Sequence, residues 1–353
     1  MMNLATALLF LSASPASAEP VAATVQEGST QFSFEAGTTY LPGRPFPVTI
    51  EIVAGATQAP VAAWLLKESA FLVNGESVGA RTSDQFLSLP AGSDLKLEFD
   101  LAPFIDVKGD FDLAYGNVGG AEPIRVSFLE PAPSDLNYME IDESELGKYM
   151  IAVDTNRGRM LWEMWPDVAP GHVRNFLDLS ASGFYDDVLF HRVIPGFMIQ
   201  GGDPNTKNPS QPERWGSGDG PRLLEAEFSD RPHVRGTLST ARKGGDDNSA
   251  SCQFFVVHAR APHLDREYTV FGQLLPDSTE SLRTLDAIAS TALTSVAPGA
   301  PASTPVEPQR ILGATIVLHP NPPMEKGEGE MMKDEMKKEM EGEMKKEEMG
   351  GHQ

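Results

Sequence analysis

Short segments that alternate apolar and polar residues recur in the first part of this 353-residue chain. One such segment spans residues 46–53 and another spans residues 94–101. Alternation with a period of two places every second side chain on one face of an extended strand, so each segment predicts a strand with one buried face. The apolar positions of the two segments are Phe46, Val48, Ile50, Ile52, Leu95, Leu97, Phe99 and Leu101. The pattern favours a mainly β fold.

Turn signals separate these predicted strands at short intervals. Asn74 and Gly75 form a pair typical of a type I′ hairpin turn, because both residues tolerate a positive φ. Further strand patterns follow at residues 111–115 and 124–129. Together they predict a small β-sandwich-like domain over residues 19–130. We find no cluster of catalytic residue types in this domain, so we expect a spacer or a binding module, and the sequence does not identify its partner.

The N-terminus has the pattern of a secretory signal. Residues 4–11 form a short apolar segment, and Ala16-Ser17-Ala18 fits a small-x-small cleavage site. The preceding residues lack the usual Lys or Arg. The apolar segment is too short to cross a bilayer. We therefore expect a signal peptide over residues 1–18 and an exported protein, in the periplasm, the cell envelope or the medium, that does not span the membrane.

Charge and cysteine content exclude some classes of function. The formal net charge is −22, which argues against a nucleic-acid partner because such proteins need a positive face. The single cysteine, Cys252, rules out an intramolecular disulfide and a site with several thiolate ligands. Its apolar neighbours predict a small buried core residue and not a reactive thiol. His191, His258 and His263 lack the spacing of metal ligands, so we expect no metal site.

The remaining chain divides into a linker, a second domain and a tail. Residues 131–146 are rich in proline at first and acidic afterwards, which predicts a linker. Residues 149–164 predict a hairpin around a turn. Apolar residues recur with helical spacing over 168–179 and 281–289, and residues 311–318 predict a closing strand. A β-rich domain with two helices follows from this order.

The tail, residues 320–353, has a different composition. It holds seven of the 14 methionines, among many Glu, Lys and Gly residues: Met324, Met331, Met332, Met336, Met340, Met344 and Met349. High charge and few aromatic residues predict a low-complexity, disordered or fraying helical segment. An alternative is binding of Cu(I) by these thioethers near His352. In that case the chain would be a metal-handling protein of the cell envelope.

The most informative stretch for function is 190–203. It places one fixed cation, Arg192, and one amide, Gln200, beside large apolar side chains, with no usual nucleophile. Such a set can hold an uncharged peptide against an apolar wall while one donor polarises it. It is not the residue set expected for breaking a covalent bond.

Residues 190–203, with the sequence FHRVIPGFMIQGGD, resemble the signature of cyclophilin-type peptidyl-prolyl cis–trans isomerases. Residues 235–242, 251–257 and 263–272 resemble three further blocks of that family, in the family's order. The resemblance covers residues 147–319. It implies a closed eight-stranded antiparallel barrel capped by two helices, with no cofactor. It also implies catalysis of rotation about X-Pro bonds in proline-containing polypeptide segments.

The resemblance also assigns roles to residues of this chain. Arg192 would donate to the twisting peptide, with Gln200 and Phe197 beside it as catalytic residues. The substrate-binding positions would be Met198, Ala241, Arg242, Gln253, Phe255, His263, Leu264 and Tyr268. His263 stands where many members have Trp, a position that the resemblance links to cyclosporin binding more than to turnover. Tyr268 stands where many members have His, and it still supplies an apolar ring and a hydrogen-bonding tip.

Alternatives to these assignments remain at this point. Arg192 fits an ordinary surface salt bridge, and the apolar positions fit ordinary barrel core. The rival function is a scaffold or chaperone that binds proline peptides with little turnover. An isomerase that assists the folding of exported proteins is the function that the sequence favours.

Overall fold

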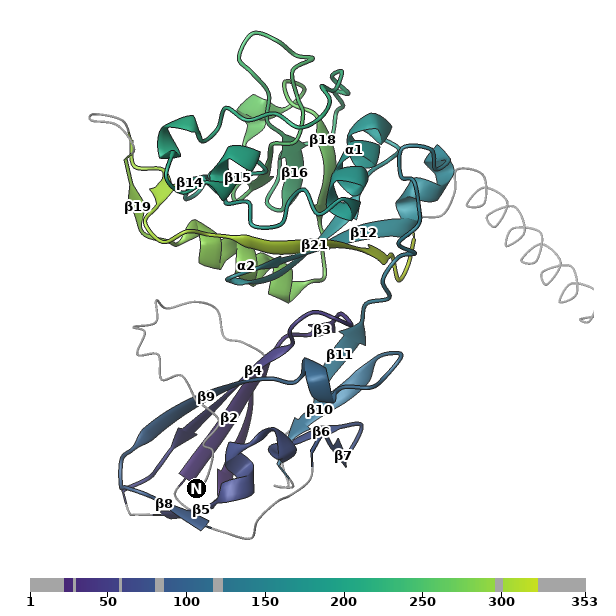
Figure 1. Ribbon diagram of the computed structural model, residues 1–353. Helices are drawn as coiled ribbons and strands as arrows, with labels where there is room; N and C mark the ends of the chain where they lie inside the picture. Colours follow the sequence, from purple (N-terminus) through teal and green to yellow (C-terminus); the bar gives the residue numbers. More distant parts are fainter. Residues whose placement is uncertain are drawn as a thin grey trace, which may run out of the picture.

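A computed structural model describes most of the chain, which forms two β units joined in sequence (Figure 1). The described residues are 22–27, 30–56, 59–79, 86–116, 123–295 and 301–322. The predicted signal peptide, residues 1–18, and the methionines of the predicted tail lie outside them. The predictions about those two segments therefore stay predictions.

The N-terminal unit is a sandwich of two sheets. The first sheet has the order β1 (Ala22–Glu27), β2 (Thr30–Ala36), β4 (Pro47–Val53) and β9 (Asp94–Asp100). The second has the order β3 (Thr39–Tyr40), β11 (Ile124–Phe128), β10 (Phe111–Tyr115), β6 (Phe71–Val73) and β7 (Glu76–Ser77). A separate pair consists of β5 (Ala59–Ala62) and β8 (Phe86–Leu89).

One apolar core joins the two sheets of the sandwich. Phe34 and Ile50 of the first sheet are fully buried in the same cluster as Phe111 of the second. The alternation in the sequence thus corresponds to one inward face on each strand. Asn74 and Gly75 have φ of 51° and 85° between the paired strands β6 and β7, which confirms the predicted hairpin turn.

The second unit is an eight-stranded antiparallel barrel, as the sequence predicts. Its strands, in spatial order, are β14 (Arg192–Ile194), β15 (Met198–Gly201), β17 (Phe254–Val257), β16 (Thr237–Thr240), β18 (Val270–Leu274), β13 (Gly158–Met164), β12 (Tyr149–Thr155) and β21 (Ile311–Leu318). The two edges meet at a bridge between Leu189 and Arg310, which closes the barrel. A short pair, β19 (Leu293–Thr294) and β20 (Thr304–Pro305), lies beside β14.

Two α-helices pack on the barrel, α1 (Pro170–Ala181) and α2 (Thr279–Ala289). Proline at the first position of α1 suits the helix start because its missing N–H would have no partner there. Glu227 accepts from the backbone N–H of Gly171 and His172, and Ser278 caps α2 by accepting from Ser281. The 3₁₀ helices are η1 (Ala63–Leu66), η2 (Glu68–Ala70), η3 (Ala102–Phe104), η4 (Glu143–Lys148), η5 (Pro204–Lys207), η6 (Pro212–Arg214) and η7 (Pro262–Leu264). None of the helices in the described residues is long and apolar enough to cross a membrane.

The residues predicted as a linker, 131–146, run along the barrel. Pro131 forms a β-bridge with Val317 of β21. Tyr138 and Leu146 are buried in the main core of the barrel, 3% and 0% exposed. The connection between the two units is therefore held against the second unit by its own apolar side chains.

Strand β12 is buried on both of its faces. Ile151 and Val153 point into the barrel core, whereas Met150 and Ala152 face the N-terminal unit. A second apolar cluster forms on that outer side, and it contains residues of both units: Leu41, Leu129, Met150, Ala152, Leu161 and Val317. We call this cluster, with the polar contacts described next, the interdomain seam.

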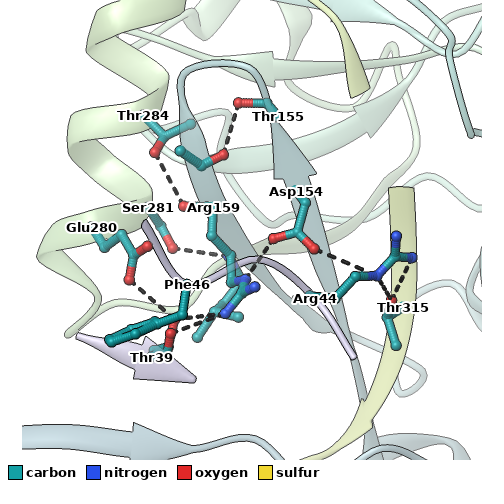
Figure 2. Close-up of polar contacts among 12 residues, drawn as sticks. Thr39, Arg44, Phe46, Asp154, Thr155, Arg159, Glu280, Ser281, Thr284 and Thr315 are labelled. Carbon is teal, nitrogen blue, oxygen red and sulfur yellow. Dashed lines mark hydrogen bonds and ion pairs between the residues drawn. The ribbon is translucent and has the colours of Figure 1, made fainter. Parts of the chain in front are cut away.

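A buried arginine connects the two units at the seam (Figure 2). Arg159 of β13 is 6% exposed, and its Nε donates to Oδ1 of Asp154 at 2.7 Å. Its Nη1 donates to the backbone carbonyl of Thr39 in the N-terminal unit at 3.0 Å. Glu280 of α2 accepts from the Thr39 hydroxyl at 3.0 Å. The charge of Arg159 is thus paired with Asp154, and its Nε and Nη1 donate inside the seam.

A second arginine crosses the seam from the other side (Figure 2). Arg44 donates from Nη2 and Nε to the hydroxyl of Thr315 at 2.8 and 3.0 Å. Its Nε also lies 3.7 Å from Oδ2 of Asp154. The Arg44 guanidinium lies against the backbone at Gly313, where a β-carbon would displace it from its present position.

Candidate active site

The outer face of β15 and β17 carries an apolar surface separate from the barrel core. Phe254 and Val256 point into the barrel, whereas Phe255 and Val257 point outward, as strand alternation requires. The outward cluster contains Met198, Phe255, Val257, Ala261 and Leu264, with Ile194, Phe197, Ala241 and Tyr268 packed against it. The predicted proline-pocket residues therefore meet in one cluster of their own and are not part of the main barrel core. We call this surface, with the polar residues along its edge, the groove.

A chain of polar side chains runs along the groove. Arg192 and Gln200 are cross-strand partners on β14 and β15, and Arg192 Nη1 donates to Gln200 Oε1 at 3.2 Å. Gln200 Nε2 donates to Gln253 Oε1 at 3.1 Å, and Gln253 Nε2 donates to the carbonyl of Gly218 at 2.8 Å. The predicted residues Arg192, Gln200 and Gln253 are thus brought together in a fixed orientation. Gly218 was not predicted, because a backbone acceptor leaves no residue-type signal.

The charge of Arg192 has no counter-ion in the part of the chain that the structure describes. The residue is exposed, and its side chain contacts the Gln200 amide and, at 3.9 Å, the Met198 sulfur. Partial burial lowers the pKa of Arg192, and Tyr268 opposes the shift. A guanidinium nevertheless stays charged at neutral pH. The predicted alternative, a surface salt bridge, is absent among the described residues.

The rim of the groove contains the other predicted residues. His263 lies beside Phe197 with 5.3 Å between ring centroids. Arg242 lies over the Tyr268 ring at 4.8 Å and forms an ion pair with Asp247 at 3.3 Å. The departures from the family pattern at His263 and Tyr268 therefore still place rings on the groove wall.

The ring of Phe255 packs against a buried histidine, His233. The His233 ring stacks on Phe255 with 6.0 Å between centroids. His233 Nδ1 lies 3.2 Å from Asp265, and Nε2 lies 3.0 Å from the Ser239 hydroxyl. Burial lowers the pKa of His233, while a hydrogen bond from Arg260 holds the pKa of Asp265 well below its ordinary range. A neutral, immobilised ring therefore fixes one wall of the groove.

Two hollows flank Gln200. The first, of about 140 Å³, is lined by Gln200, Gln253, Ala241 and Arg242, and also by Ser217 and Lys243. The second, of about 350 Å³, lies on the Arg192 side and is also lined by His191, Trp215, Gly216, Ser303 and Thr304. Sequence reasoning missed the walls of the second hollow, because they come from loops without a recognisable motif.

His191 is the least expected member of the second hollow. It is 6% exposed, and neither ring nitrogen has a partner in good hydrogen-bond geometry among the described residues. Burial lowers the pKa of His191 to about 4, although Asp203 and the nearby Leu189 carbonyl oppose the shift. The ring is therefore neutral at neutral pH, with one N–H donor and one acceptor nitrogen unused.

Comparison with known proteins supports a family assignment. The family described as "Cyclophilin type peptidyl-prolyl cis-trans isomerase/CLD" matches residues 150–316. A peptidyl-prolyl cis-trans isomerase of Synechococcus elongatus is 41% identical over 142 residues, which are 39% of this chain and 91% of that protein.

Other relatives are longer than the shared region. A peptidyl-prolyl cis-trans isomerase-like 2 protein of Gibberella zeae is 41% identical over 145 residues, which are 40% of this chain and 24% of that protein. A putative bifunctional phosphatase/peptidyl-prolyl cis-trans isomerase of Streptococcus pyogenes is 35% identical over 183 residues, 44% of this chain and 37% of that protein.

A solved cyclophilin-type isomerase of Cryptosporidium parvum has 31% identity and a TM-score of 0.41, and the match covers 49% of this chain and 98% of the solved chain.

Proposed function

The chain belongs to the cyclophilin-type peptidyl-prolyl cis–trans isomerase family, and on that premise we propose that its barrel isomerises X-Pro bonds in exported polypeptides with Arg192 as the catalytic donor. The barrel over residues 150–316 is the isomerase domain of the chain. The export of the protein is supported by the signal-like residues 1–18. The role of Arg192 is supported by its place in the groove.

The reaction is slow without help because the peptide bond resists twisting. The barrier to rotation is about 18–20 kcal/mol, since twisting removes amide resonance. In the twisted state the prolyl nitrogen regains a lone pair and becomes a hydrogen-bond acceptor. A catalyst that donates to this nitrogen stabilises the twisted state more than the planar ones, and each ~1.4 kcal/mol gained there is tenfold in rate.

The groove supplies the parts for such a mechanism. Met198, Phe255 and Leu264 form an apolar floor on which a pyrrolidine ring can rest without polar contacts. Gln200 and Gln253 each use one amide hydrogen within the chain and keep a second one for a peptide carbonyl. Holding one side of the bond while the other side rotates is catalysis by orientation. Arg192 Nη1 is held by Gln200, so the guanidinium is positioned before substrate arrives.

The observation that carries the proposal is the unneutralised charge of Arg192 beside this apolar floor. The test is a protease-coupled isomerisation assay with a peptide that contains one Ala-Pro bond. We expect Arg192→Ala to lower kcat/KM about a hundredfold, because one charge-assisted hydrogen bond in the twisted state is lost. A matched control is Arg125→Ala, which removes an exposed arginine paired with Asp110 and Asp112 and should leave kcat/KM unchanged.

The outcome also decides between the enzyme and its rival. Peptide binding by the unaltered protein without any acceleration would favour a proline-binding scaffold. Acceleration that survives in Arg192→Ala would leave the isomerase in place but contradict the role given to Arg192.

A further inference from the structure

The second hollow opens next to the groove and shares residues with it. Gln200 lines both hollows, and Arg192 forms part of the wall of the larger one. The rest of that wall comes from the segment around Trp215 and from Ser303 and Thr304 beside β14. A polypeptide held with its proline on the apolar floor would therefore have a neighbouring residue within reach of the hollow, since one extended residue spans about 3.3 Å.

The electrostatics of the hollow favour an anion. Arg192 is the one permanently charged residue among those that line it, and it makes no ion pair with any described carboxylate. A guanidinium has five donors, and only Nη1 contacts Gln200 and Met198. The other edge of the fork remains for a second acceptor.

A buried acid beside the hollow, Asp203, already has hydrogen-bond donors of its own. Asp203 is fully buried behind Gly216. Its carboxylate accepts from the backbone N–H of Asn205 at 2.7 Å and of Gly218 at 3.3 Å, and also from Gly216 at 2.5 Å. These donors offset its charge, so it competes weakly for Arg192.

His191 adds a second polar group to the same wall. A β-carbon at Gly216 would lie 3.6 Å from His191 Nε2, so this nitrogen faces the glycine wall of the hollow. Burying an imidazole without a hydrogen-bond partner costs free energy, because its hydrogen bonds to water are lost and not replaced. Both ring nitrogens have less than 1 Å² of accessible area, so the imidazole contributes a neutral wall to the hollow and no donor to a ligand. Trp215 also lines the hollow and offers apolar surface for the methylene groups of a bound side chain.

We propose that this hollow is a subsite for the carboxylate of an aspartate or glutamate that lies near the isomerised proline in the client chain. The carboxylate accepts from the free edge of Arg192, and His191 forms part of the neutral wall beside it. This inference rests on the proposed function and adds a substrate class to it, namely acidic X-Pro segments.

The test uses the full chain and a set of peptides with one Ala-Pro bond. Each of the three positions on either side of this dipeptide is alanine, glutamate, glutamine or lysine in turn, and kcat/KM is measured for each peptide. At one position we expect glutamate to exceed alanine by about five- to tenfold, because a charge-assisted hydrogen bond to a partly buried group is gained. Glutamine should gain less and lysine should fall below alanine. Raising the salt to about 0.5 M should reduce the preference for glutamate.

Two variants connect the preference to the hollow. Ser303→Phe fills the hollow from its rim, and Ser303→Ala is the matched control that leaves it open. We expect the ratio of the glutamate to the alanine rate to fall to about one in Ser303→Phe and to persist in Ser303→Ala. His191→Phe, which keeps a neutral ring in the wall, should leave the same ratio unchanged within twofold. Circular dichroism melts show whether each variant is folded.

The outcomes separate the two proposals. If the alanine peptide is not accelerated by the unaltered protein, the proposed function fails. If it is accelerated but glutamate brings no gain at any position, only the acidic subsite is overturned. Equal gains for glutamine and glutamate would also overturn it, since they would indicate a site for neutral amides.

Discussion

The groove and the interdomain seam both place an arginine beside apolar surface, but they treat its charge in opposite ways. At the seam, Arg159 is buried, forms an ion pair with Asp154 at 2.7 Å and donates to Thr39 at 3.0 Å. In the groove, Arg192 is exposed and contacts only an amide and a thioether among the described residues. Arg159 is paired within the fold, whereas the charge of Arg192 stays unpaired among the described residues.

The difference shows that one residue type can be paired and buried in one place and left unpaired in another. A buried charge must be paired, or its desolvation opposes folding. At the seam this pairing also joins the two units, because Thr39 and Asp154 belong to different units. A partly exposed charge can stay unpaired at low cost, and its donors remain available. Burial together with pairing therefore separates the two roles better than residue type does.

The largest expected effect is a loss of folding stability when the arginine of the seam is removed, and it tests the comparison directly. Arg159→Ala leaves Asp154 without its close cation, and such a loss costs about 3–5 kcal/mol in buried pairs. Arg44, 3.7 Å from the same carboxylate, tempers the loss, so we expect a value near the lower end. Urea denaturation measures it. Arg192→Ala is the matched variant and should change the unfolding free energy by no more than about 0.5 kcal/mol. Equal losses in the two variants would contradict the comparison.

An effect of intermediate size concerns the folding stability of the protein at acidic pH. Burial lowers the pKa of His191 from 6.5 to about 4, so the unfolded chain binds this proton more readily than the folded one. The stability from His191 is therefore fully present above about pH 6.5 and is lost as the pH falls towards 4, by up to about 3 kcal/mol. Denaturation at several pH values measures this slope. His191→Phe should reduce the slope over the same range, and unchanged slopes would show that His191 is not the group responsible.

The smallest expected effect tests how Glu280 contributes to the stability of the seam. Burial raises the pKa of the Glu280 carboxyl, although Arg159 opposes the shift. Its stability contribution is thus present below 4.5 and lost as the pH rises through the folded pKa, opposite in direction to that of His191. Glu280→Gln keeps an oxygen that accepts from Thr39, so we expect a change below about 1 kcal/mol by urea denaturation. Glu280→Ala should cost more, and equal costs would assign the effect to charge and not to the hydrogen bond.

The groove was predictable because its residues lie in continuous segments of sequence. Met198 and Gln200 are two positions apart on β15, so strand geometry alone puts both on the outer face. The hairpin of β12 and β13 was predictable from its turn and its flanking strand patterns. For the two helices, the sequence also indicated where they begin, because Pro170 suits a first helical position and Ser278 suits a cap, and the structure confirms both signals.

The seam was not predictable from sequence, because its contacts connect distant residues. Arg159 and Thr39 are 120 positions apart, and an isolated arginine after a turn has no local signal for its partner. One sign was present in the sequence: residues 150–153 are uninterrupted apolar residues, which is typical of a strand buried on both faces. The second hollow was hidden for a similar reason, since Trp215 and Ser303 come from separate loops.

The double burial of β12 limits how this protein can be divided. Without the sandwich, the outside of the barrel would expose an apolar band made of Met150, Ala152, Leu161 and Val317. Exposed bands of this kind promote self-association. We therefore expect the barrel to aggregate when it is produced without the N-terminal sandwich. The sandwich keeps this apolar face of the barrel away from other molecules.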